Sequence, residues 1–307
     1  MVTGFPVIKA YMEIDESSES DTSPETCVSA NVFPGRPDVL YVLEDFLCLN
    51  KEQKLNDDAI EFFMSKLSER YGVMCMSPSF YTQLTTPNAE EVDKDDSYPS
   101  FVHEARSRIS YNKVCRWYDD VFRHDLVFIP VWRENHYILL VVCYPRAIPY
   151  GSCACLKTPA DPDMQGPAVT CIMAFDSMSK LGWVTENLVN PIRDYLTLQW
   201  LQECRGELHA VDFKCVELVK MHTPQQKNEY DCGLCVLRMV EAVVGCPPEV
   251  DDLKFDVSGR RVPMMYMNAF RMNIMKDYRE KLKCEMRQCS IEQGRWNEKW
   301  DQLFDVK

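Results

Sequence analysis

The sequence predicts an α+β domain in which a mixed central β-sheet is flanked by helices, with helices dominating both ends of the chain. Short apolar runs rich in β-branched residues occur only in the middle of the chain, where they have the length of strands. Longer stretches with apolar residues at i, i+3, i+4 and i+7 lie before, between and after these runs. The 307 residues suffice for one large domain or two small ones, and no internal repeat is visible.

The first segment, residues 1–38, is predicted to be an acidic disordered tail, because "IDESSESDTSPETCVSANVFPGRP" contains too few apolar residues to offset the entropy of ordering. The folded domain is predicted to span residues 39–307. Its first clear helix is "LNDDAIEFFMSKLSERY", with Asn56 as the N-cap and two aspartates in the first turn. A charged loop follows, and a second helical stretch is predicted over residues 101–122.

Four apolar runs are predicted as buried strands, because they are short and β-branched. They are residues 125–132, 136–145, 171–178 and 213–221. A Pro/Gly-rich insert at about 146–170 separates the second strand from the third. Three further segments are predicted to be helical, namely residues 186–200, 232–244 and a C-terminal stretch from about 263 to 304.

Composition narrows the possible functions. The net charge of −13 argues against binding to a nucleic-acid backbone and favours partners with basic surfaces. No apolar run reaches the roughly 20 residues that span a bilayer, and the first residues do not resemble a secretory signal. We therefore expect a protein without membrane or nucleic-acid partners, located in the nucleus, the cytoplasm or both.

The 15 cysteines are expected to be mostly reduced and packed in the core, since their number is odd and no export signal is evident. Cys153 and Cys155 have no further ligand nearby and are expected to lie in an exposed loop. Cys232 and Cys235 stand at the start of an apolar helical run. A metal clip, a redox pair, or a catalytic nucleophile beside an uninvolved cysteine would each produce this pattern.

Of these three interpretations, the position of Cys232 favours the catalytic nucleophile. A helix N-terminus stabilises a thiolate at Cys232, and Gly233 would let a substrate backbone approach closely. His136 opens a buried strand, and Asp176 ends a neighbouring one; alone, each has an ordinary structural explanation, as a half-buried histidine and as a helix cap. Gln226 could direct an amide N–H toward an oxyanion, together with the backbone N–H of Cys232. Together these residues form a nucleophile, base and orienting set.

Four segments resemble the Ulp/SENP family of cysteine proteases that act on ubiquitin-like modifiers. "TPQQKNEYDCGLCVLRMV" resembles its nucleophile signature, "FIPVWRENHYILLVVCYP" its histidine strand, "CIMAFDSM" its aspartate strand and "LNDDAIEFFM" its N-terminal helix. The resemblance implies a papain-like, adenovirus-protease-like fold without metal or cofactor. It also implies that His136 is the general base, Asp176 its orienting partner, Cys232 the nucleophile and Gln226 the oxyanion donor.

Within the family, "KVCRWYDDVFRHDLVFIPVWRENHYILLVVCYP" is most similar to the branch that trims SUMO chains, which also carries insertions between the His and Asp strands. The resemblance therefore implies a monomeric SUMO-specific isopeptidase whose partners are SUMO and SUMO-conjugated proteins. The family places aromatic residues around a tunnel for the Gly-Gly tail of the modifier. Here Tyr137 and Lys54 take those positions, and Lys54 departs from the aromatic pattern.

Three alternatives stay open at this level. The same chemistry could act on NEDD8 or ubiquitin instead of SUMO. The chain could be an inactive module that binds a ubiquitin-like protein. The third alternative is a redox or zinc role for Cys232 and Cys235, although no second ligand pair of the kind found in structural zinc sites is apparent.

Overall fold

The structure is a computed structural model, and it describes residues 43–87, 98–150, 170–178, 182–203, 211–248, 265–294 and 296–303. Three sequence predictions lie outside or mostly outside these ranges: the acidic tail at 1–38, most of the insert at about 146–170, and the loop that carries Cys153 and Cys155.

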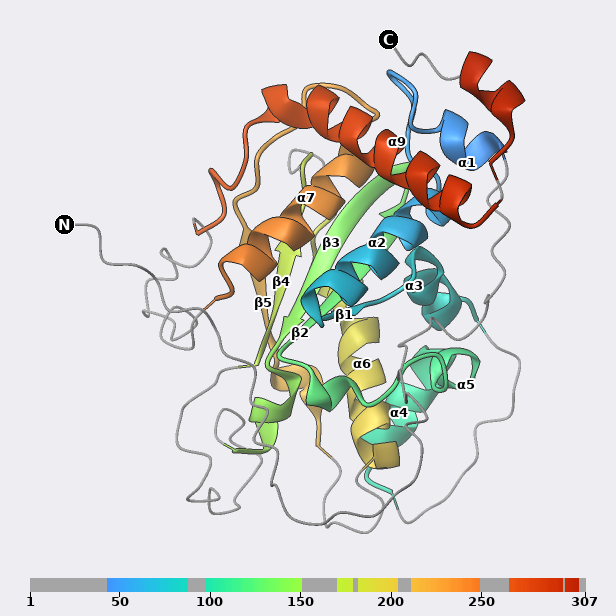
Figure 1. Cartoon of the computed structure of the whole chain (residues 1–307). Helices are drawn as coiled ribbons and strands as arrows, with labels where there is room; N and C mark the ends of the chain where they lie inside the picture. Colours follow the sequence, from blue (N-terminus) through green and yellow to red (C-terminus); the bar gives the residue numbers. More distant parts are fainter. Residues whose placement is uncertain are drawn as a thin grey trace, which may run out of the picture. The chain divides into compact units, whose positions relative to one another are not determined.

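A five-stranded mixed sheet with the order β1-β2-β3-β4-β5 forms the centre of the described residues (Figure 1). The strands are β1 Met74–Cys75, β2 Leu126–Arg133, β3 His136–Cys143, β4 Cys171–Phe175 and β5 Glu217–Met221. The central strand β3 runs antiparallel to both of its neighbours, β2 and β4, and each edge strand runs parallel to its neighbour. The predicted α+β class with a mixed sheet is therefore confirmed.

Helices cover both faces of this sheet (Figure 1). The α-helices are α1 Leu43–Leu47, α2 Asp57–Tyr71, α3 Pro78–Thr85, α4 Ser100–Arg108, α5 Tyr111–Val114, α6 Glu186–Glu203, α7 Cys232–Gly245 and α9 Met275–Glu292. The 3₁₀ helices are η1 Val121–Arg123, η2 Pro145–Tyr150, η4 Phe213–Cys215, η6 Met272–Ile274 and η7 Glu298–Gln302.

Helix α2 begins and ends where the sequence predicts. Asn56 is its N-cap, and its side-chain oxygen accepts a hydrogen bond of 2.9 Å from the N–H of Ala59. The helix ends at Tyr71 and is capped by Gly72, whose φ of 66° is the left-handed conformation that closes many helices.

The continuous helical stretch predicted over residues 101–122 is wrong, because the structure divides it into α4, α5 and η1. The break occurs at Ile109, whose φ of −131° is extended. Next to it, the N–H of Ser110 donates to the carbonyl of Leu84 at 2.8 Å, and the Ser110 hydroxyl donates to the carbonyl of Thr86. Contacts with the end of α3 thus replace the helical hydrogen bonds, which local periodicity cannot foresee.

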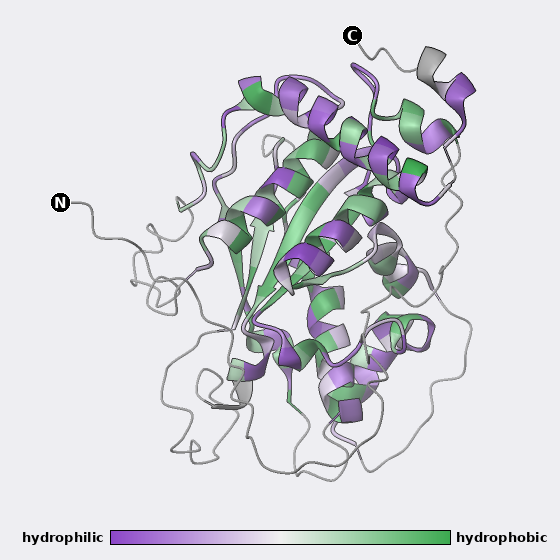
Figure 2. Ribbon diagram, in the orientation of Figure 1, coloured by the Kyte–Doolittle hydropathy of each residue, from purple (hydrophilic) through white to green (hydrophobic). Residues whose placement is uncertain are grey.

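The sheet separates two apolar cores. All of β3 is buried, and its side chains alternate between the cores. Leu139, Val141 and Cys143 face the core beneath α2, α7 and α9, whereas Ile138 and Leu140 face the core beneath α3 to α6. Figure 2 shows the hydrophobic residues concentrated on the sheet and on α7, with hydrophilic residues on the outer turns of the helices.

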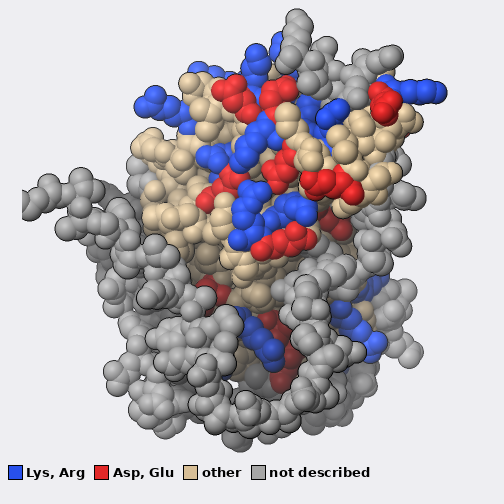
Figure 3. All heavy atoms as spheres, viewed as in Figure 1, with Lys and Arg blue, Asp and Glu red and all other residues tan. Residues whose placement is uncertain are grey.

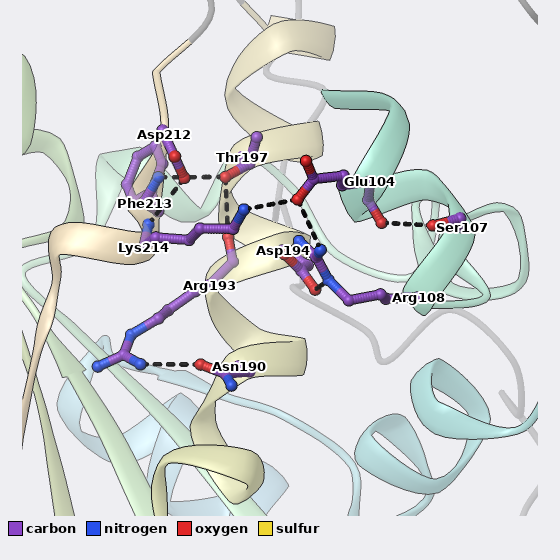
Figure 4. A network of polar contacts seen from close by, with 10 residues as sticks. All are labelled: Glu104, Ser107, Arg108, Asn190, Arg193, Asp194, Thr197, Asp212, Phe213 and Lys214. Carbon is purple, nitrogen blue, oxygen red and sulfur yellow. Dashed lines mark hydrogen bonds and ion pairs between the residues drawn. The ribbon is translucent and has the colours of Figure 1, made fainter. Parts of the chain in front are cut away.

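On the face of the sheet covered by α3 to α6, a polar network connects α4, α6 and η4 (Figure 4). Arg108 donates from Nε and Nη2 to the two carboxylate oxygens of Asp194, at 2.7 and 2.6 Å. Lys214 donates to Glu104 at 2.9 Å. Since Asp194 is buried and Arg108 is partly exposed, the first pair links the core to the surface of this face.

The outer surface over α2 and α9 carries both signs of charge despite the net charge of the chain (Figure 3). Arg70 pairs with Glu285 across the two helices at 2.9 Å, and Lys66 pairs with Glu69 within α2 at 3.0 Å. Among the described residues, no helix is long and apolar enough to cross a membrane.

The first and last described elements meet in an aromatic cluster. The ring of Phe46 in α1 lies 5.1 Å from that of Trp296 and 5.3 Å from that of Trp300 in η7, measured between ring centroids. The two tryptophan rings also contact each other edge to face at 5.5 Å.

Candidate active site

The local backbone places His136 at the edge of the sheet. Strands β2 and β3 form a hairpin in which Arg133 pairs with His136, so only Glu134 and Asn135 make the turn. Both turn residues have positive φ, 50° and 64°, as a two-residue type I′ turn requires. Lys54 donates from Nζ to the carbonyl of Asn135 at 2.9 Å and so ties this turn to the segment before α2.

Asp176 lies beside His136 because it directly follows β4, the neighbour of β3. The His136 Nε2–H donates to Asp176 Oδ1 at 2.8 Å, and both side chains are buried, with 2% and 4% of their surface exposed. The same Oδ1 accepts from the backbone N–H of Met178 at 2.8 Å. The cap-like role considered for Asp176 and its contact with the histidine therefore coexist.

The pKa of His136 is raised. Burial of the ring lowers this pKa, whereas the hydrogen bond to Asp176 and the nearby Cys232 raise it, and the second pair of effects is larger. Nδ1 of the ring is buried and makes no hydrogen bond with the described residues. The histidine therefore has one nitrogen held by a carboxylate and a second nitrogen without a hydrogen bond, next to a cysteine.

Cys232 is the first residue of α7 and is buried. At this position it lies at the end of the helix where unpaired N–H groups and the helix dipole favour negative charge. Helix α7 packs between β3 and α2. The structure thus brings His136, Asp176 and Cys232 together from the start of β3, the end of β4 and the start of α7.

Gly233 has a packing reason for being a glycine. A Cβ added there would lie 2.9 Å from Ile60 Cδ1, closer than real Cβ contacts, and 3.0 Å from Leu55 Cβ, tighter than most of them. The side-chain position of Gly233 therefore faces the protein's own core at the start of α2. Its expected contact with a substrate backbone stays a prediction.

Gln226 is tied to the residues that follow β4. Its backbone N–H donates to the carbonyl of Ser177 at 3.0 Å, and its side-chain Oε1 accepts from the Ser177 hydroxyl at 2.6 Å. Its Nε2 donates one hydrogen to the carbonyl of Asn228 at 2.6 Å. Since an amide nitrogen carries two hydrogens, this orientation leaves Gln226 one further N–H to donate.

Tyr137 and Lys54, the expected walls of a substrate tunnel, differ in exposure. Tyr137 has 1% of its surface exposed; its hydroxyl donates to the carboxylate of Asp57, and its ring lies 4.5 Å from that of Trp132. Lys54 is exposed and uses its ammonium on the hairpin turn. Their role toward a modifier tail stays a prediction.

Two residues near the site were not identified from the sequence. The ring of Trp183 lies over that of His136, with centroids 4.7 Å apart and planes inclined by 37°. Arg279 in α9 pairs with Asp231, the residue before Cys232, at 3.0 Å. Neither residue belongs to a recognisable spacing pattern, and an aromatic residue soon after the aspartate strand was the only available signal for Trp183.

Cys235 belongs to the core. It is buried among apolar side chains of α7, and burial raises the pKa of its thiol far above the ordinary range. Both Cys232 and Cys235 are free thiols in the structure. The predicted packing role of Cys235 is therefore confirmed.

Comparisons with known proteins agree on one family. The model of the Ulp1 protease family, C-terminal catalytic domain, matches residues 53–289. The chain is 27% identical over 229 residues to the probable ubiquitin-like-specific protease 2B of Arabidopsis thaliana, covering 71% of this chain and 22% of that protein. It is 22% identical over 270 residues to ubiquitin-like-specific protease 2 of Schizosaccharomyces pombe, covering 80% of this chain and 39% of that protein.

These matches concern only part of the relatives, since the chain spans well under half of the length of both proteins. A solved structure described as a de-sumoylating protease has the same fold, with a TM-score of 0.52 and 19% sequence identity. The likeness covers 84% of this chain and 92% of that one. The resemblance stated from the sequence segments, and the fold that it implied, are confirmed.

Proposed function

This chain belongs to the Ulp1 protease family of cysteine peptidases, and from that premise we propose that it hydrolyses the bond after the C-terminal Gly-Gly of SUMO. Our proposal assigns the nucleophile to Cys232, the general acid and base to His136, the orienting carboxylate to Asp176 and the oxyanion donor to Gln226. All four residues lie within the range that the family model matches.

The observation that carries this proposal is that one ring nitrogen of His136 is hydrogen-bonded and the other is not. Nε2 is held by Asp176 at 2.8 Å, which leaves Nδ1 to exchange a proton with Cys232. The raised pKa of His136 shifts its equilibrium toward the imidazolium form relative to an unperturbed histidine, in the direction that a thiolate–imidazolium pair requires. The carboxylate fixes the ring and stabilises its charge.

The first half of the reaction forms a thioester. The Cys232 thiolate attacks the carbonyl carbon of the last glycine, and the carbonyl oxygen becomes an oxyanion. The second N–H of Gln226 and the backbone N–H groups at the start of α7 are suited to stabilise that charge, because donors fixed in advance favour the tetrahedral state. The C–N bond then breaks, and the leaving lysine amine takes the proton from His136.

The second half releases the modifier. His136, now neutral, removes a proton from a water molecule that attacks the thioester carbon. The carbon–sulfur bond breaks, and the modifier leaves with a free carboxylate. Cys232 and His136 return to their starting protonation states, so no cofactor is consumed.

Two observations support a ubiquitin-like modifier as the substrate. Relatives of the chain are named ubiquitin-like-specific proteases, and one in Mus musculus is named sentrin-specific protease 7. The net charge of −13 would complement a modifier with basic residues beside its tail. The proposal places Tyr137 and Lys54 at the passage for the modifier tail, which would admit residues without a Cβ more readily than larger ones.

A set of activity probes tests the proposal. SUMO carrying a C-terminal propargylamide should form a covalent adduct with the wild-type chain and none with Cys232→Ala, as measured by intact mass. Cys235→Ala is the matched control and should retain the adduct, since Cys235 packs in the core.

The same probe made from ubiquitin or NEDD8 defines the substrate. Faster labelling by either of these than by SUMO would overturn the SUMO assignment while keeping the peptidase chemistry. An adduct that survives Cys232→Ala would overturn the nucleophile. SUMO binding without any adduct would indicate an inactive binding module.

A further inference from the structure

We propose that Arg279 in the C-terminal helix α9 is a positioning residue for Cys232, because it holds the Asp231 carboxylate away from the start of α7. This inference rests on the proposed function only in taking Cys232 as the nucleophile. Arg279 lies far from Cys232 in the sequence, and it reaches the site through folding alone.

Asp231 stands at the capping position of α7, but its side chain does not cap the helix. It is the N-cap of α7, and an aspartate there ordinarily accepts a hydrogen bond from the second or third N–H of the helix. Here its side chain makes no capping hydrogen bond. Its Oδ1 accepts instead from Arg279 Nη2 at 3.0 Å, and its Oδ2 accepts from Asn228 Nδ2 at 2.8 Å. Both carboxylate oxygens are thus directed to other partners.

The orientation of this carboxylate matters because Asp231 immediately precedes the first turn of the nucleophile helix. The first N–H groups of a helix have no partner within the helix, and a capping carboxylate would occupy one of them. With Asp231 turned aside, those N–H groups stay available to the thiolate and to an oxyanion. Arg279 also places a positive charge on the carboxylate, so the negative charge next to Cys232 is compensated.

Because both side chains are buried, Arg279 compensates the negative charge of Asp231 strongly. Arg279 and Asp231 have 4% and 7% of their surface exposed, so little water screens the pair. The charge of Asp231 is felt in the first turn of α7: burial raises the pKa of Cys235, and the carboxylate adds to that rise. Cys232 also acts on three other ionisable side chains: it raises the pKa of His136 in part, and it adds to the raised pKa values of Tyr137 and Cys235.

The guanidinium itself is fixed by carbonyl groups from another part of the chain. Arg279 Nη1 donates to the carbonyls of Cys48 and Asn50, at 3.1 and 3.2 Å, and the guanidinium lies 5.9 Å from the centroid of the Tyr230 ring. A planar fork with several donors suits this three-way contact better than an ammonium would. Helix α9 therefore connects the segment after α1 to the residue that precedes the nucleophile.

The experiment measures how fast iodoacetamide alkylates Cys232 in the full chain, followed by mass spectrometry of the peptide that contains it. Arg279→Met should slow this alkylation by at least about tenfold, since an uncompensated charge worth roughly 1.4 kcal/mol changes a rate by that factor. Arg279→Lys should recover part of the rate, because it keeps the charge and loses the fork.

The double variant Arg279→Met with Asp231→Ala, which removes both the charge and the capping oxygen, separates this role from a loss of folding. Removing the carboxylate charge should restore most of the alkylation rate, although the double variant has lost both partners of the ion pair. An unchanged rate in Arg279→Met would overturn the proposal. A double variant as slow as the single one would overturn it as well.

Arg70→Met is the matched control for the docking of α9. It removes the exposed Arg70–Glu285 pair between α2 and α9 and touches neither Asp231 nor Cys232, so the alkylation rate should not change. An equal slowing in this control would assign the effect to the docking of α9 and contradict the positioning role.

A second readout uses a SUMO–fluorophore substrate. Arg279→Met should lower kcat and leave KM nearly unchanged, since a buried side chain does not contact the modifier. If the wild-type chain fails to cleave this substrate, the proposed function fails, while the alkylation result still decides the role of Arg279.

Discussion

At the scale of single residues, the site depends on which atom of each side chain is held and which is left available. His136 has one nitrogen bound to Asp176 and the other unbound, and Gln226 has its amide fixed by Ser177 and Asn228. Short chain segments determine much of this, because His136 follows a two-residue turn and Asp176 immediately follows a strand.

The raised pKa of His136 has a consequence for stability against pH. Because the folded-state pKa lies above the unfolded value of about 6.5, protonated His136 stabilises the folded chain. This contribution is fully present below about pH 6.5 and is lost as the pH rises through the folded-state pKa.

Asp176→Asn should therefore lower the pKa of His136 and reduce kcat by on the order of 10²-fold or more, because the carboxylate no longer stabilises the imidazolium. NMR titration of the histidine ring protons measures the pKa, and steady-state kinetics measures kcat. His124 is the internal control: burial lowers its pKa, and aspartates of its own region act on it, so the substitution should leave its titration unchanged. A His136 titration that stays unchanged in the variant would contradict the assigned interaction.

Sequence reasoning reached the residues whose role follows from their place on a strand or helix, such as His136, Asp176 and Cys232. It did not reach Trp183 or Arg279, because their contacts with the site join segments that are brought together only by the tertiary fold. It also did not foresee that the Tyr137 ring is buried, since exposure depends on Trp132 from the paired strand.

At the scale of elements, the approach of α7 to α2 fixes the start of the nucleophile helix. Gly233 allows this approach, since any Cβ would meet Ile60 and Leu55. The position of Cys232 is therefore coupled to the packing of the preceding helix.

Gly233→Ala should destabilise the chain by about 1–3 kcal/mol, the usual cost of overpacking, although alanine is the better helix former. Thermal unfolding measures this as a decrease in Tm of about 2–4 °C per kcal/mol. Adding Ile60→Val removes the nearest clashing atom and should recover part of the loss.

Gly245→Ala is the control in the same helix, because nothing lies within 4 Å of an added Cβ at its other end. It should leave Tm unchanged or raise it. A Gly233→Ala variant as stable as this control would refute the packing explanation.

The helices themselves were predictable where one apolar face dominates, as in α2 and α7. The division between α4 and α5 was not predictable, because Ser110 bonds to the end of α3. Strand β1 was also missed, since two residues are too few to produce a periodic pattern.

At the scale of the whole domain, the two cores on either face of the sheet are held together differently. The core beneath α2, α7 and α9 supports Cys232, whereas the opposite core is fastened by the polar network of α4, α6 and η4 (Figure 4). Damage to that network should affect folding more than catalysis.

Arg108→Met should lower the free energy of unfolding by about 1–3 kcal/mol, because it leaves the buried Asp194 carboxylate without its charged partner. We expect less than for a fully buried pair, since 38% of the Arg108 side chain is exposed. Urea unfolding measures the loss, and kcat at 25 °C should stay within about twofold, because neither Arg108 nor Asp194 belongs to the site.

Arg123→Met provides the comparison. Arg123 makes a more exposed ion pair with Asp120 at 3.5 Å, and such pairs contribute about 0–1 kcal/mol. Equal destabilisation by the two substitutions would contradict the importance assigned to Asp194.

The aromatic contact between α1 and η7 bears on how such a domain can be used. Phe46 packs against Trp296 and Trp300, so the polypeptide enters and leaves the described fold at adjacent points. A module whose first and last described elements adjoin can be inserted between unrelated segments without disturbing the packing of its interior. Such a unit could therefore occur within longer polypeptides of different composition without changes to its core. The two relatives compared above are longer in this way, since the chain matches 22% and 39% of their lengths.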